Sequence, residues 1–278
     1  MRLRDGRVVR FPAVMGVLNV TPDSFSDGGL YLEPDRAVAH ALEMEAAGAD
    51  IIDVGGESTR PHGAHEVAPA IELARVKPVL ERLAGRLRVP LSIDTRQAVV
   101  ARFALDAGAA IVNDVSALEA DPQMAALVAR SKCAIVLMHM RGGPANHMKF
   151  ARYHDVVREV VRYLAARVRF ALRVGVAASR IIIDPGIGFA KTAEHNLKIL
   201  GSLSRICALG YPVLIGASRK GFVRKISGAG NDQILFGTSA VNALAIAAGA
   251  AIIRVHDPAP AVAVVKMGAA VAAARHRL

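Results

Sequence analysis

Residues 13–29 read AVMGVLNVTPDSFSDGG, a short apolar run followed by a polar loop. The run, residues 13–18, follows Pro12 and is typical of a strand buried on both faces, as in a parallel sheet. The loop is rich in short oxygen-bearing side chains such as Asn19 and Asp27. Loops that leave the carboxyl ends of strands hold the chemistry of α/β enzymes, although an ordinary polar turn has a similar composition. Recurrence of the same arrangement along the chain favours the functional interpretation.

Size and composition fit a large aliphatic core. The chain has 278 residues, of which 53% are hydrophobic and 4% aromatic, with no Trp, so the core must be Val, Ile, Leu and Ala. That length suits one (β/α)₈ barrel or two small domains. Cys133 and Cys207 lie in apolar surroundings and are expected to be core residues. Neither a signal peptide nor a membrane span is visible, so we expect a cytoplasmic protein.

Strand-then-helix units recur along the whole chain. We expect strands at residues 13–18, 51–54, 91–94, 111–114, 134–138, 181–184, 213–216 and 251–255. Expected helices are residues 35–47, 71–83, a segment through Val99 and Phe103 that Gly108 stops, and residues 155–174, 193–207, 238–248 and 260–275. Because no linker separates the units, we predict an α/β fold with a single (β/α)₈ TIM barrel spanning residues 1–278. A doubly wound open sheet remains the alternative, since periodicity does not establish closure.

In a barrel, the residues that close each strand meet at one mouth. The set comprises Asn19, Asp53, Asp94, Asn113 or Asp114, His139, Asp184, Ser218 to Lys220, Arg254 and His256. The residues after the last two strands seek anions, at the place where barrels commonly bind phosphate. Asp94, Asn113 and Asp184, which we place on the opposite rim, suit a flat heterocycle with adjacent N–H donors. A hydrolytic metal site fits poorly because the first strand ends without a His-x-His pair.

The motifs at these strand ends resemble those of the dihydropteroate synthases of the folate pathway, from about residue 14 to 257. The resemblance is carried by MGVLNVTPDSFSDGG (15–29), DVGGESTRP (53–61), SIDT (92–95), NDVS (113–116), LMHM (137–140), DPGIGF (184–189), SRK (218–220) and RVHD (254–257). Such a protein condenses 6-hydroxymethyl-7,8-dihydropterin diphosphate with p-aminobenzoate. The products are 7,8-dihydropteroate and pyrophosphate.

The resemblance also implies roles for residues at matching positions, a Mg²⁺ ion on the diphosphate held in part by Asn19, and a homodimer. The roles are pterin binding by Asp94, Asn113, Met138, Asp184, Phe189, Gly216 and Lys220, diphosphate binding by Asn19, Thr59, Arg254 and His256, p-aminobenzoate binding by Phe25, Arg60, Pro61, Phe189, Ser218 and Lys220, and catalysis by Asp27, Arg60, Asp94 and Lys220. The expected partners are therefore small-molecule substrates, with neither nucleic acid nor membrane.

One departure and two alternatives accompany this interpretation. His62 follows Arg60 and Pro61 where the family usually has Gly, an apparent one-residue insertion before Gly63 in the second loop. A methyltetrahydrofolate methyltransferase would share the pterin-facing acids but has no use for a diphosphate grip. The net charge of +11 and an arginine stripe on residues 155–174 suggest nucleic-acid binding, but such a stripe is usually a solvated helix face.

Overall fold

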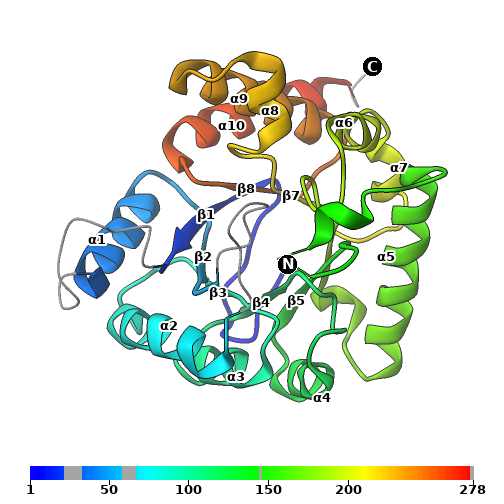
Figure 1. Ribbon diagram of the computed structural model, residues 1–278. Helices are drawn as coiled ribbons and strands as arrows, with labels where there is room; N and C mark the ends of the chain where they lie inside the picture. The colour runs from blue at the N-terminus through cyan, green and yellow to red at the C-terminus, as the bar shows by residue number, and fades with distance from the viewer. Residues whose placement is uncertain (22–32, 58–66, 144–145, 276–278) are drawn as a thin grey trace.

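The computed structural model describes residues 1–21, 33–57, 67–143 and 146–275, and it places parallel strands in a ring surrounded by helices (Figure 1). Each strand is a short apolar run ending in a polar or glycine residue, or close to one. The strands are β1 Ala13–Asn19, β2 Ile51–Gly55, β3 Leu91–Asp94, β4 Ile111–Asp114, β5 Ala134–Met138, β6 Ile181–Asp184, β7 Leu214–Ile215 and β8 Ile252–Val255.

The ring closes between β6 and β7. Along the sheet the strands follow the order β6-β5-β4-β3-β2-β1-β8-β7. A parallel bridge then pairs Ile183 of β6 with Val213, just before β7, and the Ile183 N–H donates to the Pro212 carbonyl at 2.9 Å. The predicted (β/α)₈ barrel is therefore confirmed, and an open doubly wound sheet is excluded.

Helices pack around the outside of the ring and bury its outer face (Figure 1). The helices are α1 Glu33–Ala46, α2 Pro69–Leu83, α3 Ala98–Asp106, α4 Pro122–Ser131, α5 Val156–Arg173, α6 Ala193–Gly201, α7 Leu203–Cys207, α8 Gly221–Ser227, α9 Asn231–Ala247 and α10 Pro258–Arg275, with short 3₁₀ turns at His147–Phe150 and Ala178–Arg180.

The expected helix at residues 193–207 is two helices, because the backbone leaves helical geometry at Ser202, directly after Gly201. Two helices were not predicted. One is α4, which begins with Asp121 accepting a hydrogen bond from the Gln123 N–H at 2.8 Å. The other is α8, and α9 also begins seven positions before the expected residue 238, at Asn231.

Two apolar layers lie on either side of the strands. The outer layer joins the strands to the helices, and the inner layer fills the amino-terminal half of the barrel with residues such as Met15, Ile111 and Ile182. Leu3 and Val9, from the first ten residues, pack onto the inner layer and cover that end. The amino-terminal half of the barrel is therefore a packed core, and the carboxyl ends of the strands form a polar mouth. Cys133 is buried as expected, Cys207 is half-buried, and neither forms a disulfide with a described residue.

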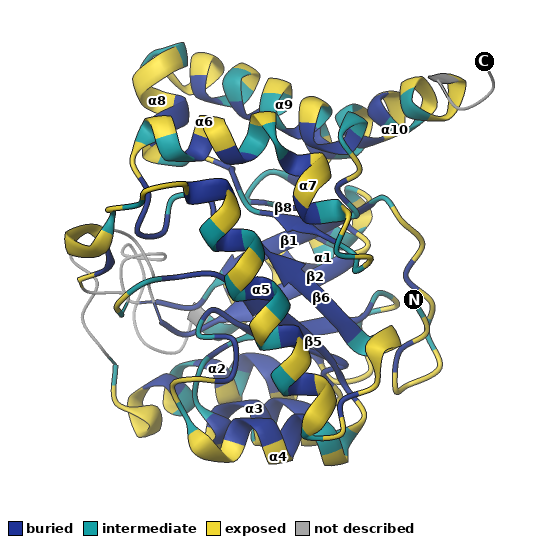
Figure 2. Cartoon of the chain, turned by 90° about the vertical axis from the view of Figure 1, so that its right-hand side faces the viewer, coloured by how far each residue is buried: buried dark blue, intermediate teal, exposed yellow. Residues whose placement is uncertain are grey.

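The arginine stripe is a solvated face of α5, as expected. Four of its arginines, Arg158, Arg162, Arg169 and Arg173, are exposed, while Val157, Val160, Leu164 and Val168 on the other side of the helix are buried (Figure 2). Leu172, which the spacing of the apolar residues would place on the buried side, is exposed. In the described part of the chain, no helix has the length and apolarity needed to cross a bilayer.

Candidate active site

Parallel register brings the polar strand ends to one level of the barrel. Asp94 of β3 lies opposite Gly55 of β2 and Asn113 of β4, and Met138 of β5 lies opposite Asp184 of β6. Because successive strand residues point to opposite faces, only one of two neighbours can enter the barrel. Asn113 is the one that does so: its amide donates to Asp53 Oδ2 at 2.9 Å. Asp114 instead accepts hydrogen bonds from the Ser116 and Leu118 N–H groups in the turn after β4.

Arg254 joins the ends of three strands. Its Nε donates to Asp53 Oδ2 and its Nη2 to Asp94 Oδ2, each at 2.7 Å. Asp53 is fully buried, and its Oδ1 has no partner among the described residues. Gly216 lies beside this arginine, because a Cβ at that position would be 3.8 Å from the Arg254 Cβ. The expectation that Arg254 lies on the rim opposite the acidic groups is therefore wrong, because it binds two of the carboxylates.

Removal from water governs the protonation of this group. Burial raises the pKa of Asp94 to about 7, and the neighbouring Asp53 acts in the same direction, while Arg254 opposes both. Burial also disfavours the charge of Arg254, but Asp53 and Asp94 outweigh it, so the pKa of the guanidinium is raised. Arg254 therefore stays charged, and Asp94 is poised to gain or lose a proton near neutral pH.

A second group lies around the end of β6. Asp184 Oδ1 accepts from the Gly186 N–H at 2.6 Å, and no described residue donates to its Oδ2. Burial raises the pKa of Asp184 to about 6, against the effects of that N–H and of Lys220. The Lys220 ammonium lies 4.0 Å from the centre of the Phe189 ring, a cation–π contact. Burial, reinforced by Arg254, lowers the pKa of Lys220 to about 8, so it is mostly charged at neutral pH.

The loops after β7 and β8 meet at the rim. The His256 ring Nδ1 lies 3.1 Å from Ser218 Oγ, and burial together with Arg254 lowers the pKa of His256 to about 4. His256 is therefore neutral at pH 7, so it can bind an anion through a hydrogen bond but not through a positive charge. Arg219 and Asp257 form a bidentate ion pair at 2.7 and 3.0 Å that links the two loops.

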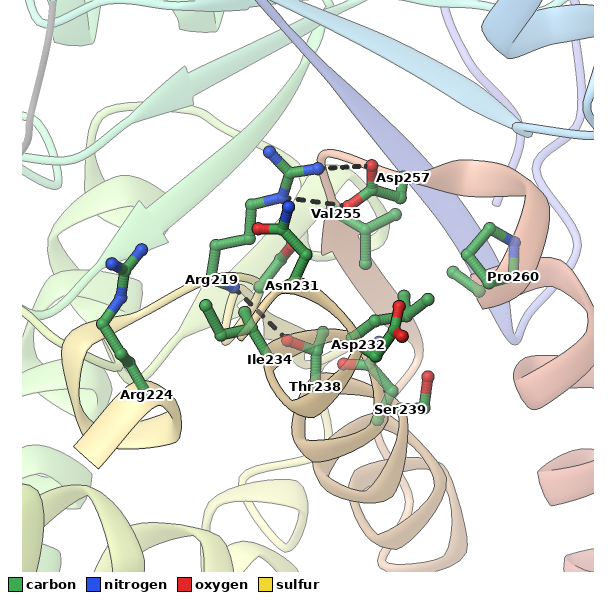
Figure 3. Close-up of a pocket in the computed structure, with 14 residues that line it drawn as sticks. Arg219, Arg224, Asn231, Asp232, Ile234, Thr238, Ser239, Val255, Asp257 and Pro260 are labelled. Carbon is green, nitrogen blue, oxygen red and sulfur yellow. Dashed lines mark hydrogen bonds and ion pairs between the residues drawn. The ribbon is translucent and has the colours of Figure 1, made fainter. Parts of the chain in front are cut away.

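Next to this rim is a cavity of about 480 Å³ that the sequence did not reveal (Figure 3). It lies between α9, the end of β8 and the start of α10, with the Arg219–Asp257 pair at its edge. Of the residues assigned from the sequence, it includes only Ser218. The cavity is thus adjacent to the expected site but does not coincide with it.

The structure brings most described members of the predicted site together. Met138 and Phe189 share one buried apolar cluster with Val115 and Met140, and Asn19 is half-buried at the end of β1. Among the described residues, His, Cys, Asp and Glu form no cluster that could hold a metal alone. The predicted site residues Phe25, Asp27, Thr59, Arg60 and Pro61 lie outside the described residues.

Two further residues prove central to the packing of the site: Asp53, which the sequence placed at the mouth without a role, and Lys191, which it did not single out. Asp53 links Arg254 to Asn113, and its position at a strand end was the available signal. Lys191 is 3% exposed and lies beneath the Phe189 turn. Nothing in the local sequence signals that burial, because a lysine next to a helix start usually reaches solvent.

The barrel thus has a mouth that combines carboxylates, an amide and paired cations, and the comparisons with known proteins show which class of enzyme it belongs to. The model of a family described as pterin binding enzyme matches residues 15–256. The dihydropteroate synthase of Mycobacterium leprae is 51% identical over 88% of this chain and 88% of its own length.

Solved structures give the same result. That of Xanthomonas albilineans dihydropteroate synthase with 4-aminobenzoic acid has a TM-score of 0.90 and 44% identity, covering 97% of each chain. The structure of dihydropteroate synthase from the same organism with 7,8-dihydropteroate has a TM-score of 0.87 and 42% identity, covering 98% of each chain. The chain belongs to the dihydropteroate synthase family.

We predict that Arg254→Gln destabilises the fold by about 3–5 kcal/mol at pH 8, because it leaves two buried carboxylates without their cation. The loss should be smaller at pH 5.5. Arg254 lowers the pKa of Asp94, so its removal raises that pKa further above the value in the unfolded chain. The free energy of unfolding then falls as pH rises, because ionised Asp94 is disfavoured in the folded protein. At pH 5.5 Asp94 is protonated in both folded proteins, so this difference between them disappears. Urea unfolding at both pH values measures this.

The matched control is Arg219→Gln, which breaks an ion pair whose arginine side chain is 56% exposed. It should cost less than about 1 kcal/mol at either pH. Equal losses for the two variants, or a loss for Arg254→Gln that does not change with pH, would contradict the proposed charge cluster.

Proposed function

We propose that the mouth of this barrel is where the chain, as a dihydropteroate synthase, joins 6-hydroxymethyl-7,8-dihydropterin diphosphate to p-aminobenzoate. The products are 7,8-dihydropteroate and pyrophosphate. The observation that carries the proposal is the grouping of Asp94, Asn113 and Asp184 at the ends of three strands, with Arg254 bound to Asp94. The relatives named above add independent support for the same reaction.

The pterin ring is assigned to the acidic side of the mouth. Its ring N–H and amino groups are donors, and carboxylate oxygens shielded from water accept them strongly. Asp184 offers its unpartnered Oδ2, and Asp94 offers the acceptor positions that Arg254 does not use. Met138 and Phe189 supply apolar surface, with Gly216 and Lys220 alongside.

The diphosphate is assigned to Arg254, His256, Asn19 and Thr59. Arg254 provides permanent charge, while neutral His256 contributes a hydrogen bond. Mg²⁺ fits this donor set: Asn19 presents an amide oxygen at a strand end, and Mg²⁺ is commonly held by one or two protein oxygens plus substrate phosphates. When bound there, the ion would supply positive charge to the leaving group.

The chain's own residues then favour bond exchange at the pterin methylene carbon. The C–O bond to the diphosphate breaks with both electrons leaving on oxygen, and the lone pair of the aromatic amine forms the new C–N bond. Ionised Asp94 and Asp184 stabilise positive charge that develops on the pterin, and Arg254 stabilises negative charge on the departing oxygen. Asp27 is proposed to accept the amine proton.

The p-aminobenzoate is assigned to Phe25, Arg60, Pro61, Phe189 and Ser218, with Lys220 and Asp27 nearby. Of these, Phe189, Lys220 and Ser218 belong to the described part of the chain and line the rim between β6 and β8. Phe189 thus serves both substrates, which places the amine beside the methylene carbon that it attacks.

The direct experiment is to mix purified protein with both substrates and Mg²⁺ and to measure pyrophosphate and dihydropteroate. Both should form in equal amounts, and omission of either substrate should abolish dihydropteroate. Formation of neither product, or transfer of a methyl group from methyltetrahydrofolate under matched conditions, would overturn the assignment.

Asp184→Asn should weaken binding of the pterin diphosphate about 100-fold or more, because an N–H₂ group replaces a needed acceptor. For the unmodified protein, affinity should fall as pH drops below about 7, since Asp94 and then Asp184 take up protons. Calorimetry measures both effects. Asp106→Asn, at the exposed end of α3, is the control. Unchanged affinity of a folded Asp184→Asn variant would refute the assignment.

We also propose that two copies associate through α9 and α10. Large apolar side chains are exposed there: Phe236 is 69%, Leu244 71% and Met267 68% exposed. Such a concentration on two adjacent helices is typical of a covered surface, and a second copy is the simplest partner. That the chain is one cytoplasmic domain without nucleic-acid or membrane partners also remains a proposal.

The double variant Phe236→Glu with Leu244→Glu should sediment as a monomer where the unmodified protein sediments as a dimer. Ile71→Glu, at an apolar residue exposed on α2, is the control and should leave the dimer intact. A monomeric unmodified protein, or an unaffected double variant, would count against this interface.

A further inference from the structure

Lys191 is almost fully buried, between the end of β5 and the turn that follows β6. Its Nζ donates to the carbonyl oxygens of Phe189 at 2.9 Å and Gly186 at 3.0 Å, and it lies 2.9 Å from His139 Nδ1. The His139 carbonyl lies slightly farther away, at 3.3 Å. An ammonium has three protons, so these partners use all of them.

The pairing with His139 requires a neutral imidazole. Burial lowers the pKa of Lys191 to about 7, and in its charged form the ammonium has no acceptor, so His139 Nδ1 must then carry a lone pair and its proton must be on Nε2. Burial, together with the charge of Lys191, lowers the pKa of His139 to about 2, which keeps the ring neutral. No carboxylate forms an ion pair with Lys191 among the described residues, so carbonyls and one imidazole satisfy the ammonium.

The carbonyls that Lys191 binds belong to the turn that shapes the pterin side of the mouth. Gly186 has φ +69°, and a Cβ there would come within 2.0 Å of the His139 carbonyl oxygen, so the turn is pressed against the end of β5. The Gly186 N–H donates to Asp184 Oδ1. Farther along the same turn, Phe189 supports the Lys220 ammonium.

We propose that Lys191 is the positioning residue of the pterin-binding wall. By binding the Gly186 and Phe189 carbonyls at once, it fixes the turn so that Asp184 and Phe189 face the ring together. Lys191 lies behind the turn and acts only through these residues. The nature of the ligand rests on the proposed function above, but the hydrogen bonds that define the role do not.

The decisive variant is Lys191→Met, which keeps the apolar stem and removes all three donors. The two carbonyls then lose their partner, so the turn should relax. Calorimetry with 6-hydroxymethyl-7,8-dihydropterin diphosphate and Mg²⁺ should show affinity about 10-fold or more weaker. The control is Lys198→Met on the surface of α6, which breaks only the exposed pair with Glu194 and should bind normally.

A double-mutant cycle separates positioning from general stability. In a Phe189→Ala background, Lys191→Met should cost clearly less pterin affinity than in the unmodified protein, because part of its effect passes through Phe189. A merely structural lysine would lower the midpoint of thermal unfolding yet leave the affinity of the folded protein unchanged. That result, or equal losses in both backgrounds, would overturn the proposal.

Lys191→Gln retains two donors and is less disruptive, so it should show a smaller loss of affinity for the pterin diphosphate in the same calorimetric assay. If Lys191→Met does not fold, Lys191→Gln provides the test, and unchanged affinity in it would overturn the proposal. Failure of the unmodified protein to bind the pterin would instead refute the proposed function. Normal binding by the unmodified protein, Lys198→Met and both Lys191 variants would refute the positioning role alone.

Discussion

The ion pairs of Arg254 with Asp53 and Asp94 are the constraint on which the mouth of the barrel depends. They join β8 to β2 and β3 across the interior, at 2.7 Å each. Two buried carboxylates would be costly alone, and one guanidinium with two donor edges compensates both. This arrangement exists only because the sheet closes, since the register of parallel strands brings residues 160 and 201 positions apart to the same level.

Desolvation gives the mouth its chemical character. It moves the pKa of Asp94 and Asp184 up and that of Lys220 down, so each charge is held by a neighbour rather than by water. A ligand with N–H donors and an anionic group would give the carboxylates hydrogen-bond donors and the cations a counter-charge. The mouth therefore suits the substrate proposed above, and the electrostatic groups are in place before it binds.

The sequence predicted the barrel and most of the strand ends because both follow from short-range patterns. It missed what depends on three-dimensional partners. Arg254 was placed opposite the acids because its sequence neighbours suggest phosphate binding, yet closure of the sheet turns it towards Asp94. Burial of Lys191 depends on His139 of another strand. The short helix α8 has only seven residues, too few for its apolar residues to establish a helical period.

The central claim is that Asp94 lies in a dry cluster shared with Arg254, and its titration tests this most directly. Carbon-13 NMR of the Asp94 carboxyl, assigned by comparison with Asp94→Asn, would follow its protonation in the ligand-free protein. The account predicts a midpoint near pH 7, well above the ordinary value for aspartate. A midpoint near pH 4, as for a carboxyl in water, would contradict it.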